Sequence, residues 1–245
     1  MSLEETYLDI QKKFENILEV EPFSIVKSVD DHRNYWKPDR VKVLLLAESH
    51  VFTSTTEHDN LMRYDGFSEL IDCPTNYVKL VYCLGYGEQN LVRLNGNSGT
   101  PQFWKIFASC INQDLYTESG KIQLSKTPNF YQRLNNKISL LGKLKERGIW
   151  LVDASIVALY NDNIKPSPKI MKEIIEISWE QYVSKVIQEI KPEKIIVIGK
   201  GVSKILEDKL KKINIPFHVQ SQPQGIRSKK NLDETFEKYY EICNC

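Results

Sequence analysis

The sequence predicts an α/β protein, a three-layer α/β/α sandwich with a central four-stranded, mainly parallel sheet. Short aliphatic runs that read as strands alternate along the chain with longer segments whose apolar residues recur at helical spacing. Strands that alternate with helices are joined by crossover connections, which produce a parallel sheet covered on both faces. The 245 residues, 41% hydrophobic and 27% charged, fit one domain with insertions. We expect a core of residues 41–245 preceded by a helical extension of residues 1–40.

The first part of the chain opens with an amphipathic pattern. Apolar residues spaced by three and four predict a helix over residues 3–19, after which Pro22 and Pro38 bracket an irregular stretch. The aliphatic run of residues 41–46 is short, rich in β-formers and bounded by polar residues, so it predicts a central strand. Residues 51–100 contain many aromatic residues but show no clear periodicity, and no element is assigned to them.

The second part alternates regularly. A helix is expected to start at Thr100-Pro101, because proline favours the first helical turn. The spacing of apolar residues predicts the remaining elements, and Gly148 and Pro192 mark the ends of two of the helices. These are helices over residues 130–147, 170–190, 201–212 and 231–242, and strands over residues 149–154, 194–198 and 216–220.

Composition limits the partners that the protein can have. Lys and Arg total 33 against 32 Asp and Glu, so nucleic acid could be bound only through a local basic patch. No apolar run approaches the roughly 20 residues of a membrane span, and the N-terminus lacks a signal peptide, so we expect a soluble, cytoplasmic protein. The five cysteines are scattered without a CxxC pair, which favours reduced thiols over a metal or cluster site.

Polar residues follow each of the predicted strands. The segments are Ala47-Glu48-Ser49-His50, Asp153-Ala154-Ser155, Gly199-Lys200-Gly201 and Gln222-Pro223-Gln224-Gly225-Ile226-Arg227. The carboxyl ends of parallel strands meet at one edge of the sheet, where open α/β sheets bind their ligands. The glycine-flanked lysine lacks the GxxxxGK[ST] spacing of a phosphate-binding loop, so a tight strand-to-helix turn is the favoured interpretation.

In their order and spacing, these segments resemble the motifs of the uracil-DNA glycosylase superfamily. In that family the first strand ends in a Gly-Gln-Asp-Pro or Gly-Glu-Ala-Pro type of motif, and the second ends in an asparagine that reads the base. A helix opening with Trp-Glu and an aromatic residue follows, as in Trp179-Glu180-Gln181-Tyr182 here. The last strand ends in His-Pro-Ser-Pro and a residue that wedges into DNA. The resemblance covers residues 41 to about 240 and implies a uracil-DNA glycosylase-like fold.

The resemblance implies that Glu48, Ser49, His50 and Gln222 form the catalytic group. The family's catalytic aspartate falls on Ser49, which carries no charge, whereas members with alanine there place a glutamate at the position of Glu48. The family's histidine falls on Gln222, which can hydrogen-bond a carbonyl but lacks the charge of an imidazolium. His50 is either a partner of Glu48 or a structural histidine, and Glu48 itself could instead cap the next helix.

Recognition of the base is expected to involve Asp153, at the position of the family's asparagine. An ionised carboxylate only accepts hydrogen bonds, so Asp153 would favour a base that presents donors, such as cytosine or adenine. The alternative is that Asp153 caps the turn after its strand. Tyr64 and Phe67 are the candidates for stacking on the base, although no motif marks them.

The segment after the last strand is the candidate DNA-binding loop. An apolar residue after proline and glycine, followed by several cations, suits insertion between bases with phosphates held on either side. The residues concerned are Pro223, Gly225, Ile226, Arg227, Lys229 and Lys230. A solvated, charged loop is the competing interpretation.

Three functions are consistent with these features. The first is hydrolysis of the N-glycosidic bond of a damaged or modified base in DNA, with base flipping and no metal or cofactor. The second is a nucleobase-binding or nucleic-acid-binding module that has lost turnover. The third is a hydrolase of free nucleosides or nucleotides, which would explain the near-zero net charge. We expect a monomer whose partner is DNA or a ligand that contains a nucleobase.

Overall fold

The computed structural model describes residues 1–112, 129–161, 166–223, 226 and 228–245. Within them, four strands form one parallel sheet in the order β2-β1-β3-β4. The strands are β1 (Val43–Ala47), β2 (Ile149–Asp153), β3 (Lys194–Ile198) and β4 (Phe217–Gln220). Leu45 of β1 is paired with Leu151 on one side and with Ile196 on the other. With helices on both faces of the sheet, the predicted three-layer fold class is confirmed, and every pairing is parallel.

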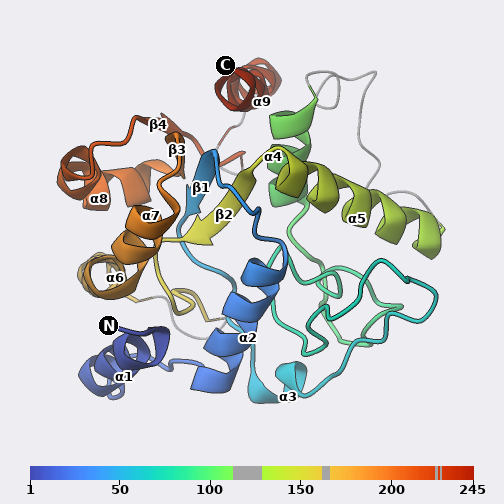
Figure 1. Ribbon diagram of the computed structural model, residues 1–245. Coiled ribbons are helices and arrows are strands. Elements are labelled where there is room, and N and C mark those ends of the chain that lie inside the picture. The colour runs from blue at the N-terminus through green and yellow to red at the C-terminus, as the bar shows by residue number, and fades with distance from the viewer. Residues whose placement is uncertain (113–128, 162–165, 224–225, 227) are drawn as a thin grey trace.

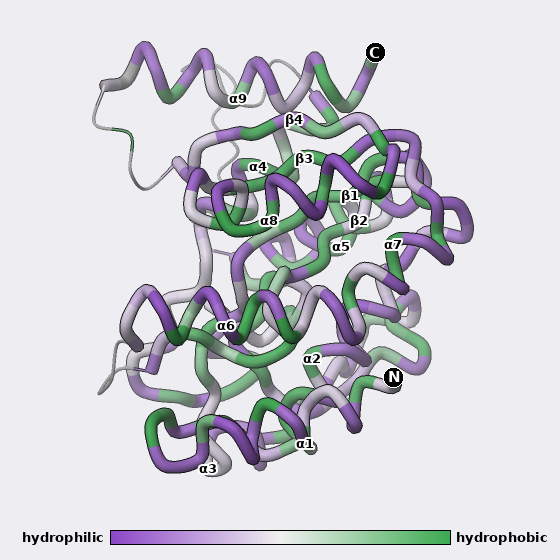
Figure 2. Tube along the Cα trace, turned by 90° about the vertical axis from the view of Figure 1, so that its left-hand side faces the viewer, coloured by the Kyte–Doolittle hydropathy of each residue, from purple (hydrophilic) through white to green (hydrophobic). Residues whose placement is uncertain are grey.

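The helices lie in two layers (Figure 1). One layer contains α4 (Pro101–Ile111) and α5 (Phe130–Glu146), with α9 (Lys229–Asn244) packed against α4. The other contains α6 (Pro168–Ser178), α7 (Ser184–Ile190) and α8 (Lys200–Lys212). In Figure 2 the central strands run through the hydrophobic interior, whereas α8 and α9 alternate between hydrophobic and hydrophilic residues, as helices with one buried face do.

Burial across the sheet follows strand position. The aliphatic side chains of β1, β2 and β3 are almost completely buried, as expected of parallel strands covered on both faces. The edge strand β4 is different, because Val219 keeps 40% of its surface exposed. A continuous apolar run is therefore a reliable signal for the central strands and a weaker one for β4.

The strand order places a switch point between β1 and β3. The chain leaves β1 for β2 on one side, whereas it leaves β3 for β4 on the other. Since crossovers between parallel strands are right-handed, the connections lie on opposite faces of the sheet and separate at the carboxyl ends of β1 and β3. Open α/β sheets bind their ligands at such a point.

The segment before the sheet belongs to the same core. Helices α1 (Leu3–Phe14) and α2 (Phe23–Tyr35) bury apolar side chains in the cluster that surrounds the strands. The prediction of an irregular stretch between Pro22 and Pro38 was therefore wrong. Pro22 immediately precedes α2, a position where the missing amide hydrogen costs nothing, and Ile25, Val26 and Val29 form its buried face. Residues 51–100 contain the short helix α3 (Thr55–His58).

Two further findings refine the sequence predictions. The helix expected over residues 170–190 is divided into α6 and α7 by a π-helical turn, η2 (Trp179–Val183). All five cysteines are free thiols, and three of them are buried. No helix among the described residues combines the length and the apolar character needed to cross a bilayer.

Candidate functional site

A cavity of about 300 Å³ opens at the switch point between β1 and β3. It is lined by Glu48, which follows β1, by the turn into α8 after β3, and by the segment that follows β4. The lining residues are Glu48, Gly199, Lys200, Gly201, Val202, Ser221, Gln222 and Ile226. The structure thus brings together three of the residues that the sequence predicted for the site, Glu48, Gln222 and Ile226, from distant parts of the chain.

One wall of this cavity is the N-terminus of α8. Gly199 is the N-cap residue with φ 105°, a conformation that favours glycine, and a glycine has no side chain of its own to cap the first turn. The amide groups of a first turn carry partial positive charge and attract anions. A Cβ atom at Gly199 would lie 3.4 Å from Cγ of Gln222, so the glutamine side chain packs directly over this turn. The cavity therefore presents a carboxylate, an amide and a positive helix end.

The backbone around Glu48 is fixed by the segment after β2. The amide of Ala154 donates to the carbonyl oxygen of Ala47 at 2.8 Å, and that of Ser155 donates to the carbonyl of Glu48 at 3.0 Å. These bonds continue the β1–β2 ladder past the strand ends. Farther along, Tyr160 lies close enough to the carboxylate of Glu48 for the two side chains to interact electrostatically. Burial, followed by the charge of Glu48, raises the pKa of Tyr160 to about 12, so this hydroxyl stays a neutral donor.

His50 is fully buried between two carboxylates. Its Nε2 donates to Oε1 of Glu21 at 2.5 Å, and its Nδ1 lies 3.8 Å from Oδ2 of Asp153. The longer distance is too great for a hydrogen bond, so Asp153 acts on the ring through its charge. Burial alone would lower the pKa of His50, but the charges of Glu21 and Asp153 outweigh burial and raise it to about 9. His50 is therefore a cation at neutral pH, and its hydrogen-bond partner is Glu21; of the two alternatives for His50, this favours the structural histidine over a partner of Glu48.

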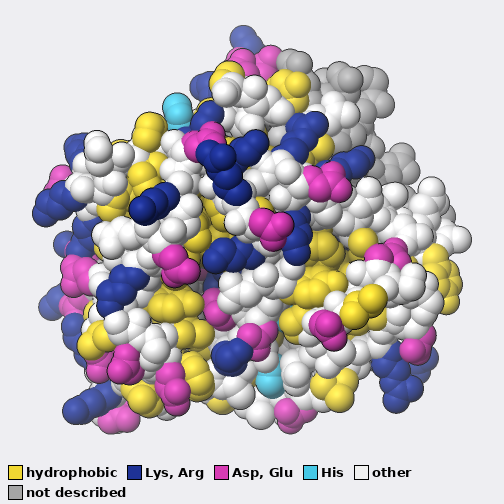
Figure 3. Space-filling model, viewed as in Figure 1, with side chains coloured by type: hydrophobic (Ala, Val, Ile, Leu, Met, Phe, Trp, Pro, Cys, Tyr) yellow, Lys and Arg dark blue, Asp and Glu magenta, His cyan; other side chains and the backbone are white. Residues whose placement is uncertain are grey.

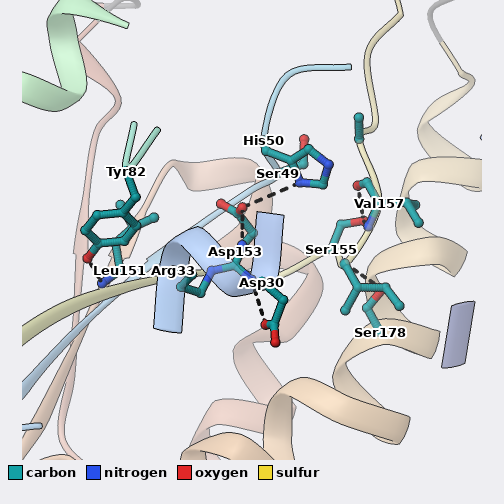
Figure 4. A network of polar contacts seen from close by, with 12 residues as sticks. Asp30, Arg33, Ser49, His50, Tyr82, Leu151, Asp153, Ser155, Val157 and Ser178 are labelled. Carbon is teal, nitrogen blue, oxygen red and sulfur yellow. Dashed lines mark hydrogen bonds and ion pairs between the residues drawn. The ribbon is translucent and has the colours of Figure 1, made fainter. Parts of the chain in front are cut away.

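Asp153 is engaged by residues of α2. Nη2 of Arg33 donates to Oδ2 of Asp153 at 2.8 Å, and Nη1 of Arg33 lies 3.4 Å from Asp30. Figure 4 shows Arg33 and His50 approaching Asp153 from different sides. Both residues of the Arg33–Asp153 pair are buried. One cation thus hydrogen-bonds this carboxylate and a second lies beside it, whereas the hypothesis of base recognition requires it to be free.

Asp153 lines a different cavity from Glu48. This second cavity, of about 40 Å³, also contacts Ser49, His50, Thr100 and Phe103. The hydroxyl of Ser49 accepts a hydrogen bond from the amide of Leu159 at 3.4 Å. The predicted site residues therefore divide into two groups: Glu48 and Gln222 face the large cavity, and Ser49, His50 and Asp153 surround the small one.

The two aromatic candidates for base stacking lie elsewhere. The Tyr64 hydroxyl donates to the carbonyl of Pro74 at 3.1 Å. Phe67 is buried and stacks on Tyr131, with 5.8 Å between ring centroids. Neither Tyr64 nor Phe67 lines the two cavities, because both rings are used in packing; Phe103 is the aromatic residue at the small cavity.

The candidate DNA-binding loop is described in part. Pro223 is buried, Ile226 is half-buried and lines the large cavity, and Lys230 is exposed, 3.9 Å from Glu234. Lys229 is the first residue of α9. Gly225 and Arg227 lie outside the described residues.

Three residues that contact this region were not predicted from the sequence: Glu21, Arg33 and Tyr160. None of them stands at a strand end or in a recognisable motif, so the sequence carries no local signal for them. Within the described part of the chain, no three His, Cys, Asp or Glu side chains are grouped as a metal ion would require.

Comparisons with known proteins add a distant likeness in fold. No family model matches the chain, and no curated protein matches it. Among solved structures, the chain is similar to the solution NMR structure of a Methanosarcina acetivorans protein that is provisionally described as a uracil DNA glycosylase. The two are 11% identical, with a TM-score of 0.33 over 83% of this chain and 94% of the other. The activity therefore has to be argued from the residues of the site.

Proposed function

We propose that this protein hydrolyses an N-glycosidic bond in nucleic acid, at the cavity between β1 and β3. The observation that carries the proposal is that a carboxylate, a side-chain amide and a helix N-terminus with glycine as its N-cap residue line one cavity of about 300 Å³. That volume is at the lower end of the range for ligand sites. These groups match the parts of a nucleotide: the helix end would bind the phosphate, the carboxylate would face the sugar, and the amide would contact the base.

Each group has a defined role in this reaction. As the bond to the base breaks, positive charge develops on the sugar, and the carboxylate of Glu48 stabilises this charge or orients the attacking water. The amide of Gln222 donates a hydrogen bond to the departing base. The first turn of α8, with Lys200 at its start, binds a backbone phosphate. We assign to Tyr160, whose neutral hydroxyl lies near Glu48, the role of orienting its carboxylate.

Entry of a base requires that it leave the stack. Ile226 lines the cavity and immediately precedes the basic stretch at the start of α9, so it is placed to fill the gap that an extruded base leaves. Asp153 has no assigned role in this proposal, because its carboxylate is paired with Arg33 and lies next to the His50 cation.

The test is release of a base from oligonucleotides that each carry one damaged or modified base. We expect Glu48→Gln to lower the rate by about 100-fold or more, because the charge that stabilises the sugar cation is removed. The matched control is Glu193→Gln, which neutralises an exposed carboxylate at the opposite end of β3. Release at an unchanged rate in Glu48→Gln would refute the assigned chemistry.

A second function, binding of nucleic acid without turnover, is favoured by the state of Asp153. The residue that would read the base is held in a buried ion pair, next to a cavity of only about 40 Å³. If this alternative holds, the wild type releases no base, and Ile226→Ala weakens binding to single-stranded DNA while Glu48→Gln leaves it unchanged. Fluorescence anisotropy at fixed salt measures both variants.

A further inference from the structure

A buried carboxylate from the N-terminal part of the chain joins the two segments that surround Glu48. Glu21 lies between α1 and α2, and its side chain is fully buried. It accepts a hydrogen bond from Nε2 of His50 at 2.5 Å. It also accepts the amide hydrogen of Ala158, whose nitrogen lies 3.3 Å and 3.2 Å from its two oxygens. One side chain thus binds the segment after β1 and the segment after β2.

Those two segments also contact each other around Glu48. The amide of Ser155 donates to the carbonyl of Glu48, and the amide of Leu159 donates to the hydroxyl of Ser49. Burial, and then the charge of the Glu48 carboxylate, raise the pKa of Tyr160 at the end of the second segment. Residues 48–50 and 155–160 therefore form a two-layered wall, of which Glu48 lines the large cavity, and Glu21 contacts both layers.

The chemistry of this position calls for a carboxylate. Both groups that face Glu21 are donors, and an ionised carboxylate is the side chain that only accepts. A glutamine would keep the shape but turn an amide donor towards the wall, and it would leave the buried His50 cation with Asp153 as its remaining acidic neighbour. Arg33 already engages Asp153, so Glu21 is the counter-ion that His50 does not share.

We infer that Glu21 is a positioning residue for Glu48: it holds the wall of residues 48–50 and 155–160 in the arrangement that directs the carboxylate into the cavity. Only the catalytic consequence of this inference rests on the proposed function, because amide exchange in the wall can be measured without substrate. It also makes the segment before the sheet a component of the site.

Amide hydrogen exchange at Ser155 and Leu159 tests the inference. In Glu21→Gln we expect exchange at both amides to be about tenfold faster than in the wild type, because the wall loses its rear contact. The matched control is Glu19→Gln. Glu19 lies two residues away, is exposed and bonds to Asn161 at 2.7 Å, beside the same segment. Exchange in this variant should equal that of the wild type, and unchanged exchange in Glu21→Gln would overturn the inference.

If base release is observed, Glu21→Gln should lower kcat by about 100-fold and leave KM unchanged, because a displaced catalytic group affects the chemical step more than binding. If the wild type releases no base, the proposed function fails, but the exchange experiment still decides the role of Glu21. An unchanged kcat with faster exchange would restrict Glu21 to folding and reject the positioning role.

The wild type alone provides a test if Glu21→Gln does not fold. The ring of His50, whose titratable neighbours are Glu21, Asp153 and Lys79, can be followed by NMR from about pH 6 to about pH 10. Protection of the Ser155 and Leu159 amides should weaken as His50 loses its proton, because a neutral ring that keeps its proton on Nε2 still donates to Glu21 but without the charge that strengthens the bond. Protection that is the same for the cationic and the neutral ring would contradict the inference.

Discussion

Two buried histidines have pKa values shifted in opposite directions, for physical reasons that the structure makes clear. Burial lowers the pKa of His32 from 6.5 to about 4. The carbonyl oxygen of Asn76, 2.9 Å from Nε2 of His32, offsets only part of this effect. Burial would do the same to His50, but two carboxylates raise its pKa from 6.5 to about 9. One ring is stable as the neutral form and the other as the cation.

The free energy of unfolding should therefore peak near pH 6.5. The contribution of His32 is complete above its unfolded pKa of 6.5 and is lost as the pH falls towards 4. The contribution of His50 is complete below 6.5 and is lost as the pH rises towards 9. Each shift corresponds to roughly 3 kcal/mol. Urea denaturation at a series of pH values measures both limbs.

Substitution of each histidine separates the two limbs. His50→Gln should make the free energy of unfolding nearly independent of pH above pH 6.5, and His32→Gln should do the same below pH 6.5. A limb that persists in the corresponding variant would show that another group causes it.

The residues of the buried network show where sequence reasoning stops. Glu48 and Gln222 could be predicted because they follow strands, and a parallel sheet carries strand ends to one edge. Glu21, Arg33 and Tyr160 reach the same region through the packing of α2 and of the segment after β2. No periodicity or motif encodes that packing, because it depends on contacts between residues 29 to 137 positions apart.

The turn from β3 into α8, which lines the large cavity, is constrained by its backbone. The φ of 105° at Gly199 is costly for any residue with a Cβ atom, whereas that atom would make only an ordinary contact with Gln222, at 3.4 Å. We expect Gly199→Ala to destabilise the protein by about 1–3 kcal/mol because of the backbone conformation alone. Thermal unfolding measures this effect.

A second glycine provides a control, because its replacement by alanine should change the stability in the opposite direction. Gly142 lies inside α5, and nothing is within 4 Å of the position of its Cβ atom. Gly142→Ala should stabilise the protein by about 1 kcal/mol, since alanine favours the helix interior. Equal effects of the two substitutions would contradict the account of the turn.

The elements also differ in how far the sequence determined them. All four strands were predicted, because aliphatic runs between polar breaks have few alternatives. Helix α2 was missed because two flanking prolines suggested irregular structure, although a proline just before a helix is compatible with it. The π-helical turn η2 could not be predicted, because its residues keep the apolar spacing of an ordinary helix.

At the scale of the whole molecule, charge is evenly mixed. The net charge is +1, and Figure 3 shows basic and acidic side chains interspersed over the visible face. A protein without a global field can bind a polyanion only through local contacts, and each phosphate contact releases counter-ions. The slope of log affinity against log salt concentration therefore reports how many phosphates contact the site.

Lys200 and Lys230 are the described cations best placed for such contacts. Lys200 lines the large cavity at the first turn of α8, and Lys230 lies in the first turn of α9, close after Ile226. Replacing either by Gln should weaken binding to single-stranded DNA and reduce the slope of log affinity against log salt by about 0.7. Anisotropy titrations at several salt concentrations measure the slope.

Lys211→Gln is the matched control, because Lys211 lies in the last turn of the same helix α8 and pairs with Glu207 at 2.8 Å. It removes the same charge from the molecule, so a long-range effect of net charge would appear in all three variants. A slope that falls for Lys200→Gln and Lys230→Gln but not for Lys211→Gln places the phosphates at the carboxyl edge of the sheet. If the three variants share one slope, whether that of the wild type or one reduced equally in all three, nucleic acid does not enter the cavity between β1 and β3. A free nucleoside or nucleotide would then be favoured as its ligand.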